Sequence, residues 1–321
     1  MLELNQHYYN TIPYNLWTGR SDSLPNERFF QNIYTYNLQQ QPIADVKESV
    51  CLMGFASDEG VRRNLGRPGA KDGPNAIRQQ LAKLACHKQI HLADLGNICC
   101  PDDNLELAQH QLIQIVDLCH SQNKKTIILG GGHEVAWPHF KGLSSHYPKV
   151  GIINFDAHFD LRPLLNGTKS TSGTGFRQMA DYCQSQNYPF TYCCLGIQPQ
   201  ANTAQLFQTA EALGVTFMTA SEMHENTTAW QTAFIDEFIL NHHFLYLTLC
   251  LDVLAEAFAP GVSAPQATGI SPWQMQPLLK YILQTGKVVA LDIAELSPPL
   301  DQDDKTARLA AVLLADLIRY F

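Results

Sequence analysis

The chain has 321 residues, of which 45% are hydrophobic and 16% charged, and its formal net charge is −8. An acidic chain lacks the basic face that nucleic-acid binding requires, and no apolar run approaches the roughly 20 residues of a membrane span. Met1 is followed by a polar segment instead of a secretory signal. We therefore expect a cytoplasmic protein with no nucleic-acid or membrane partner.

The chain divides into an irregular start and a regular remainder. Residues 1–47 are rich in Asn, Gln and Tyr without a steady period, which favours an arm over the core of a single domain that spans residues 1–321. Apolar runs then predict strands at residues 50–55, 90–95, 126–129, 150–155, 191–195, 215–218, 244–251 and 288–293. Amphipathic segments predict helices from residue 73 and at residues 104–119, 134–143, 175–183, 203–213, 230–241, 272–284 and 305–320.

This alternation of strands and helices predicts the fold class. Nearly continuous apolar strands separated by amphipathic helices are typical of a mostly parallel sheet that is covered on both faces. We expect a three-layer α/β/α architecture with about eight strands. Ligands bind such sheets outside the carboxyl ends of the strands, so the strand-to-helix junctions are the places to search for chemistry.

The strand at residues 150–155 ends in a cluster of ligand-type side chains. In an extended segment, Asp156, His158 and Asp160 point to one side. Two carboxylates beside an imidazole at the end of an apolar strand are costly to desolvate, and a divalent cation would neutralise them. Taken alone, the D-x-H-x-D pattern also fits a solvated loop that merely ends a strand.

Two other strand ends carry groups of the same kind. His133 follows three glycines, Gly130 to Gly132, and we interpret it as a metal ligand because the phosphate-binding alternative lacks its Lys-Ser/Thr pair. Cys250 and Asp252 share one face of another apolar strand, where the carboxylate again calls for a counter-ion.

These residues carry a resemblance to a known family. The sequence resembles the ureohydrolase superfamily of arginase and agmatinase, and within it the formimidoylglutamases. The resemblance covers nearly all of residues 58–310. It rests on segments 60–74, 130–134, 154–163, 172–174, 194–198, 251–254, 259–265 and 291–295, which occur in this order.

The resemblance implies an arginase-like fold and two Mn²⁺ ions per subunit that share a hydroxide. Carboxylates and imidazoles suit Mn²⁺, and two adjacent ions can lower the pKa of a shared water. Carried over by position, one ion would take His133, Asp156, Asp160 and residue 250, and the other His158, Asp156, Asp252 and again residue 250. It also implies a homo-oligomer.

Cys250 departs from the family pattern, because relatives have a bridging Asp at this position. A carboxylate spans two ions with two oxygens, whereas a single sulfur bridges alone or binds one ion. We therefore expect one or two ions here. The alternative, a small buried residue that binds no metal, has nearly equal weight.

The resemblance also implies roles in catalysis and substrate binding. Asp160 and Glu295 are candidate catalytic residues, although Glu295 is also an ordinary strand-end acid. Arg162 can pair with a substrate carboxylate, and Ser172 lies in a loop that lines the family's pocket. We expect Arg62, Arg63 and Arg67 to be solvated, with carboxylate binding as the alternative.

The implied reaction is hydrolysis of N-formimidoyl-L-glutamate to L-glutamate and formamide in histidine degradation. The small-molecule substrate has carboxylates, which agmatine lacks, whereas arginine has one. An arginase-like or agmatinase-like guanidine hydrolase would share every metal ligand. The replacement of the bridging Asp by Cys250 keeps a further alternative open, a metal-impaired relative with a binding role.

Overall fold

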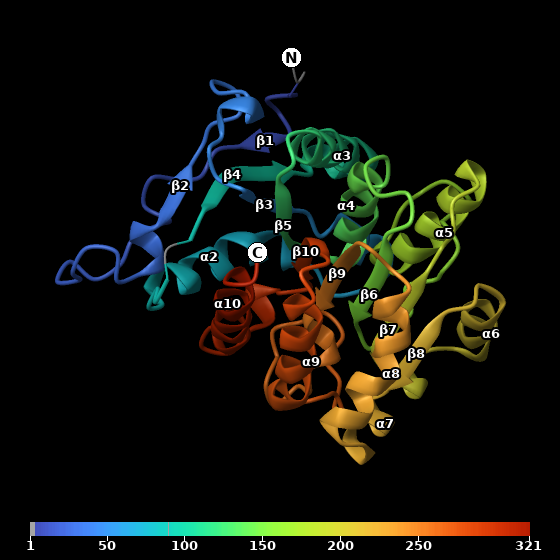
Figure 1. The fold of residues 1–321 in the computed structure, drawn as a ribbon. Helices are drawn as coiled ribbons and strands as arrows, with labels where there is room; N and C mark the ends of the chain where they lie inside the picture. Colours follow the sequence, from blue (N-terminus) through green and yellow to red (C-terminus); the bar gives the residue numbers. More distant parts are fainter. Residues whose placement is uncertain (1–3, 89) are drawn as a thin grey trace.

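The computed structural model describes residues 4–88 and 90–321. Ten strands form one sheet in the order β1-β4-β3-β5-β10-β9-β6-β7-β8, and β2 also pairs with β4 (Figure 1). Every pairing is parallel except that of β1 with β4. The predicted mostly parallel sheet is therefore confirmed.

The eight strands expected from the sequence are β3 to β10, and the N-terminal arm supplies the other two. Residues of the arm pair with β4 at the edge of the sheet, so part of the arm extends the sheet. The strands are β1 (Tyr9–Asn10), β2 (Ile33–Thr35), β3 (Val50–Ala56), β4 (Leu92–Cys99), β5 (Lys125–Gly130), β6 (Gly151–Phe155), β7 (Tyr192–Ile197), β8 (Thr216–Thr219), β9 (Leu245–Cys250) and β10 (Val288–Ala294).

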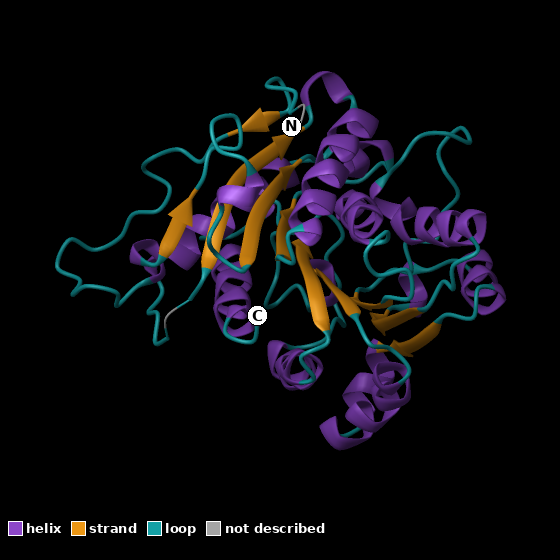
Figure 2. Ribbon diagram, turned by 45° about the horizontal axis from the view of Figure 1, so that its top comes forward, coloured by secondary structure: helices purple, strands orange, loops and turns teal. Residues whose placement is uncertain are grey.

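Helices cover both faces of the sheet, as Figure 2 shows. The side chains of α2 and α7 to α10 belong to the hydrophobic core of one face, and those of α3 to α6 to the core of the other. The helices are α1 (Glu59–Arg63), α2 (Gly73–Lys83), α3 (Leu105–Ser121), α4 (Ala136–Leu143), α5 (Gly175–Gln186), α6 (Ala204–Ala212), α7 (Ala220–Glu225), α8 (Thr228–Leu240), α9 (Pro272–Gln284) and α10 (Lys305–Ile318).

The strands explain this layering, because successive side chains of a strand face opposite sides of the sheet. In β6, Ile153 and Phe155 belong to one core, and Ile152 to the other. Both faces of the central strands are buried and largely apolar, so polar groups exposed to a ligand lie at the ends of these strands.

Two short helices, α1 and α7, were not predicted. No element was predicted between residues 55 and 73, but Glu59 accepts hydrogen bonds from Arg62 and Arg63 one turn later and stabilises α1. Thr219 and Glu222 form a capping box at the start of α7. Neither helix is long enough to give a clear apolar period.

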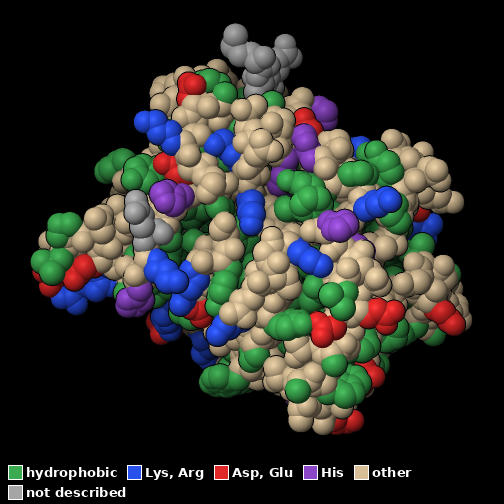
Figure 3. Space-filling model, in the orientation of Figure 1, with side chains coloured by type: hydrophobic (Ala, Val, Ile, Leu, Met, Phe, Trp, Pro, Cys, Tyr) green, Lys and Arg blue, Asp and Glu red, His purple; other side chains and the backbone are tan. Residues whose placement is uncertain are grey.

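The surface is chemically mixed. On the face that Figure 3 draws, acidic and basic side chains are spread among polar and apolar ones. Among the described residues, no helix combines the length and the apolar character needed to cross a bilayer.

The carboxyl ends of four adjacent central strands meet at one edge of the sheet. In the order β5-β10-β9-β6, each strand pairs in parallel with the next. Cys250 at the end of β9 lies opposite Ala294 at the end of β10. Residues that follow these four strands are therefore neighbours in space although they are far apart in the sequence.

Gly131 is needed for close packing at this edge. A Cβ atom there would lie 1.8 Å from the backbone oxygen of Ser57, and the amide of Gly131 donates to the carbonyl of Phe55. Its φ is not among the positive values of the chain. The glycine therefore permits the close approach of two backbone segments.

We predict that Gly131→Ala will lower the free energy of unfolding by about 3 kcal/mol, because the added methyl displaces backbone. Gly175→Ala is the control, since its Cβ would have no neighbour closer than 3.8 Å and its φ is helical. The control should leave stability unchanged or slightly raised. Equal denaturation midpoints for the two variants would contradict this explanation.

Candidate metal centre and substrate pocket

The predicted metal ligands and the candidate catalytic residue Glu295 lie at or after the ends of the four adjacent strands. His133 is in the 3-10 turn after β5, and Asp156, His158 and Asp160 follow β6. The remaining three follow the same rule: Cys250 ends β9, Asp252 lies in the next 3-10 turn, and Glu295 directly follows β10.

His133 is at the centre of the first group of ligands. Its Nδ1 lies 2.9 Å from Asp156 Oδ2 and 3.0 Å from Asp160 Oδ2. Ligand atoms of His133, Asp156 and Cys250 all lie within 4.8 Å of one another. These three side chains are buried, which leaves their charges without solvent.

His158 belongs to the second group. Its Nδ1 lies 3.2 Å from Asp252 Oδ2 and 3.4 Å from Asp156 Oδ1. Ligand atoms of Asp156, His158 and Asp252 again lie within 4.8 Å of one another. Asp156 is common to both groups, so its two oxygens face different partners.

The sequence suggested that the side chains converge because they alternate along a strand. The structure shows a different cause. β6 ends at Phe155 and β9 at Cys250, so Asp156 to Asp160 and Asp252 lie beyond the strands. Asp160 has φ +49°, and Glu295 has φ +73°. Non-glycine residues rarely adopt such angles, and this backbone strain is typical of functional sites.

Charge and burial change the pKa values in the site. Burial alone would lower the pKa of His133, but the hydrogen bonds and charges of Asp156 and Asp160 outweigh it and raise the pKa. Burial and the charge of Asp156 raise the pKa of Asp160 to about 6. Burial and the charge of Asp252 raise the pKa of Glu295. The carboxylates therefore repel one another.

The thiol of Cys250 experiences the same field. Burial raises its pKa, and the charges of Asp156 and Asp252 raise it further. Without a cation, the side chain is therefore a neutral thiol.

The residues fit a divalent cation. Asp252 Oδ1 is buried and accepts no hydrogen bond from the described residues, so it is free for a ligand. Carboxylate and imidazole donors suit Mn²⁺. A cation would also reduce the repulsion among Asp156, Asp160 and Asp252.

Hydrogen bonds outside the two groups fix the orientation of the ligands. Thr248 Oγ1 lies 2.9 Å from His133 Nε2, on the side of the ring away from the carboxylates. The backbone amide of His133 donates to Glu295 Oε1 at 2.8 Å. The side chain of Asn202 binds the backbone of Ala157 and Phe159.

Sequence reasoning missed Thr248 and Asn202. Thr248 precedes Cys250 by two residues, so strand alternation placed both on one face and offered a signal for Thr248. Asn202 follows a different strand, β7, and no local pattern indicated its role.

A pocket of about 410 Å³ opens above the ligands. Both predicted substrate-binding residues, Arg162 and Ser172, line it, as does Glu295. The lining also includes Asn64, Arg67, His133, His158, Asp160, Cys250 and Asp252.

The three arginines of the segment at residues 62–67 differ in their environment. Arg62 is exposed as expected, whereas Arg63 is largely buried, with 8% of its side chain exposed. Arg63 pairs with Glu59 and Glu106, so the expectation of a solvated side chain was wrong. Arg67 is exposed, but its guanidinium donates to the carbonyls of the 262–263 segment.

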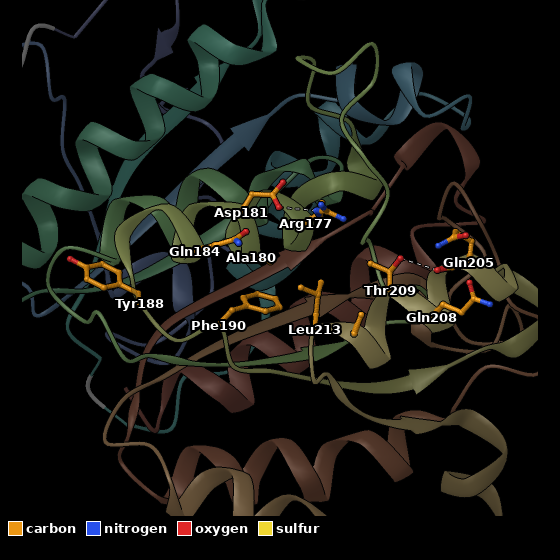
Figure 4. Close-up of a pocket in the computed structure, with 11 residues that line it drawn as sticks. Arg177, Ala180, Asp181, Gln184, Tyr188, Phe190, Gln205, Gln208, Thr209 and Leu213 are labelled. Carbon is orange, nitrogen blue, oxygen red and sulfur yellow. Dashed lines mark hydrogen bonds and ion pairs between the residues drawn. The ribbon is translucent and has the colours of Figure 1, made fainter.

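A second, larger hollow of about 770 Å³ lies near α5 and α6 (Figure 4). Its lining includes the exposed ion pair of Arg177 with Asp181 and the aromatic side chains of Tyr188 and Phe190. None of the residues predicted to be functional lines it, so the chemistry is concentrated in the smaller pocket.

The comparisons with known proteins agree with this geometry. The model of the arginase family matches residues 48–319. The chain belongs to the arginase family. A formimidoylglutamase of Legionella pneumophila (strain Lens) is 56% identical, covering 94% of this chain and 95% of the relative. One from Clostridium tetani is 40% identical, covering 99% and 97%.

Two solved structures of this family are similar in fold. The crystal structure of Trypanosoma cruzi formiminoglutamase with Mn²⁺ has a TM-score of 0.77 and 26% identity, covering 85% of this chain and 93% of that one. Bacillus subtilis formimidoylglutamase has a TM-score of 0.82 and 24% identity, covering 94% of each chain. The predicted arginase-like fold is confirmed.

We predict that Thr248→Val will weaken Mn²⁺ binding by about 10- to 100-fold, because the ring of His133 loses the partner that orients it. Titration calorimetry would measure the affinity, and Thr216→Val on edge strand β8 is the matched control. An affinity equal to that of the parent chain would show that the Thr248 hydroxyl does not support the site.

Proposed function

We propose that this protein hydrolyses N-formimidoyl-L-glutamate to L-glutamate and formamide, as a step in histidine degradation. The observation that carries the proposal is the 56% identity with a formimidoylglutamase over 94% of the chain. The pocket geometry supports it independently.

The lining of the pocket carries both acidic and basic side chains. Its floor holds Asp160, Asp252 and Glu295, and its lining also includes the guanidinium groups of Arg67 and Arg162. A protonated formimidoyl group is a planar cation that suits the acidic floor. A carboxylate of the same molecule suits an arginine. The substrate has both groups.

His133, Asp156, His158, Asp160, Cys250 and Asp252 would hold Mn²⁺, and we propose one or two ions per chain. When bound, such ions supply Lewis-acid chemistry and lower the pKa of a coordinated water. The residues around them have separate tasks.

We assign proton transfer to Asp160 and substrate orientation to Glu295. In the reaction, a water oxygen bonds to the formimidoyl carbon, and the bond from that carbon to the glutamate nitrogen breaks. Asp160 Oδ2 lies at the floor beside His133 and can carry a water proton to the departing nitrogen. Glu295 is held by the amide of His133 and can accept a hydrogen bond from the substrate.

The reaction product tests the assignment. We predict that Mn²⁺-loaded protein will release formamide from N-formimidoyl-L-glutamate faster than urea from L-arginine or agmatine. Faster release of urea would instead identify a guanidine hydrolase.

Arg162→Ala should raise KM about 10- to 100-fold with unchanged metal content, because a charge-assisted contact to the substrate is lost.

Cys250 limits the number of ions in our proposal. Its sulfur belongs to the group with His133 and Asp156, whereas the second group consists of Asp156, His158 and Asp252. We therefore propose that Cys250 contributes to one ion only, and that the second ion binds weakly.

Cys250→Asp should raise the Mn²⁺ content towards two per chain and increase turnover, because a carboxylate offers two oxygens to the site. Elemental analysis and the formamide assay measure these effects. Cys193→Asp is not a suitable control, because the thiol of Cys193 lies in the hydrophobic core. Cys250→Ala is the second variant to compare. If the parent chain, Cys250→Asp and Cys250→Ala bind the same amount of metal and turn over equally, Cys250 does not act as a ligand.

The homo-oligomer, the single domain over residues 1–321 and the cytoplasmic location stay predictions.

A further inference from the structure

We propose that Asn64 is a specificity-determining residue, which together with Ser172 and Arg162 forms a subsite for a substrate carboxylate. The inference deepens the proposed function and rests on it. Asn64 was not among the candidate residues suggested by the sequence.

The position of Asn64 is fixed by its neighbours in α1. The residue caps the carboxyl end of that helix, and its amide donates to the carbonyl of Gly60. The preceding residue, Arg63, anchors the helix through Glu59, Glu106 and the carbonyl of Ser170. These contacts hold the Asn64 side chain at the wall of the pocket.

Asn64 joins the two other members of the subsite. Its Nδ2 donates to Ser172 Oγ at 3.2 Å. A Cβ atom on Gly173 would lie 3.0 Å from Arg162 Cδ and 3.1 Å from Asn64 Nδ2, so these two side chains flank the same glycine. An amide, a hydroxyl and a guanidinium group therefore come together at one wall.

The bond from Asn64 also determines what Ser172 can do. Because its oxygen accepts from Asn64, the hydroxyl hydrogen of Ser172 is free to donate. The side chain of Arg162 is exposed, and its guanidinium makes no hydrogen bond or ion pair within the described residues, whereas its backbone amide donates to the carbonyl of Gly173. A carboxylate accepts only, so it is the complementary ligand for this set of donors.

Two other polar side chains of the pocket already have partners. The amide group of Asn202 donates to the carbonyls of Ala157 and Gln198. Arg67 uses two guanidinium nitrogens on the carbonyls of Val262 and Ser263. The acidic floor repels an anion. Among the described residues of the pocket, the wall with Asn64 brings together an amide, a hydroxyl and a guanidinium group, so we assign the carboxylate to it.

Asn64→Asp tests the subsite, because it replaces a donor by a like charge and offers Arg162 a competing partner. We expect KM for N-formimidoyl-L-glutamate and the inhibition constant of L-glutamate to rise about 10- to 100-fold. The value of kcat and the metal content should stay within about threefold of the parent, because the subsite is separate from the ligand groups. Asn64→Ala should show a smaller change in the same direction.

Asn15→Asp is the matched control, since it makes the same chemical change at an exposed position of the arm. The control should leave both constants unchanged. If Asn64→Asp binds substrate and L-glutamate as tightly as the parent, the inference is wrong while the proposed function stands. A merely structural role would lower kcat, metal content and melting temperature alike in both Asn64 variants. Failure of the parent to release formamide would instead contradict the proposed function.

Discussion

The desolvation of carboxylates in one buried pocket is the constraint on which the site depends. Asp156 and Asp252 are almost entirely buried, and Asp160 and Glu295 lie beside them. Two imidazoles offset part of this charge, yet an oxygen of Asp252 has no partner among the described residues. Such a cluster is costly in a folded protein unless a cation or a cationic ligand occupies it. The metal and the amidinium substrate both meet that requirement.

The parallel sheet makes this concentration of charge achievable. Its largely apolar strands provide a rigid, dry support, and the residues at their carboxyl ends supply the ligand-type side chains. Four adjacent strands, β5, β10, β9 and β6, each contribute a segment. The loop beyond β6 adds Arg162 and Ser172 to the wall of the pocket, and Asn64 comes from the carboxyl end of α1, which follows β3. One pocket can thus bind a cationic group and a carboxylate of the same molecule.

Much of this arrangement was predictable from the sequence. Apolar strands alternating with amphipathic helices indicated the layers and the sheet, and ligand-type residues at strand ends indicated where they meet. The contacts of Asn64 and Asn202 were not predictable, because both depend on loops that pack together from distant parts of the chain. The prediction that Arg63 is solvated was wrong for the same reason, because its partner Glu106 is 43 residues away in the sequence. The close approach at Gly131 also has no local signal.

The central claim is that the buried acidic cluster binds a divalent cation, and elemental analysis combined with thermal unfolding tests it most directly. After Mn²⁺ loading and dialysis, the protein should retain one or two ions per chain. Removal of the metal with a chelator should then lower its melting temperature, because a ligand that binds only the folded state stabilises it. A chain that retains no metal and unfolds at the same temperature with Mn²⁺ as with chelator would contradict the account.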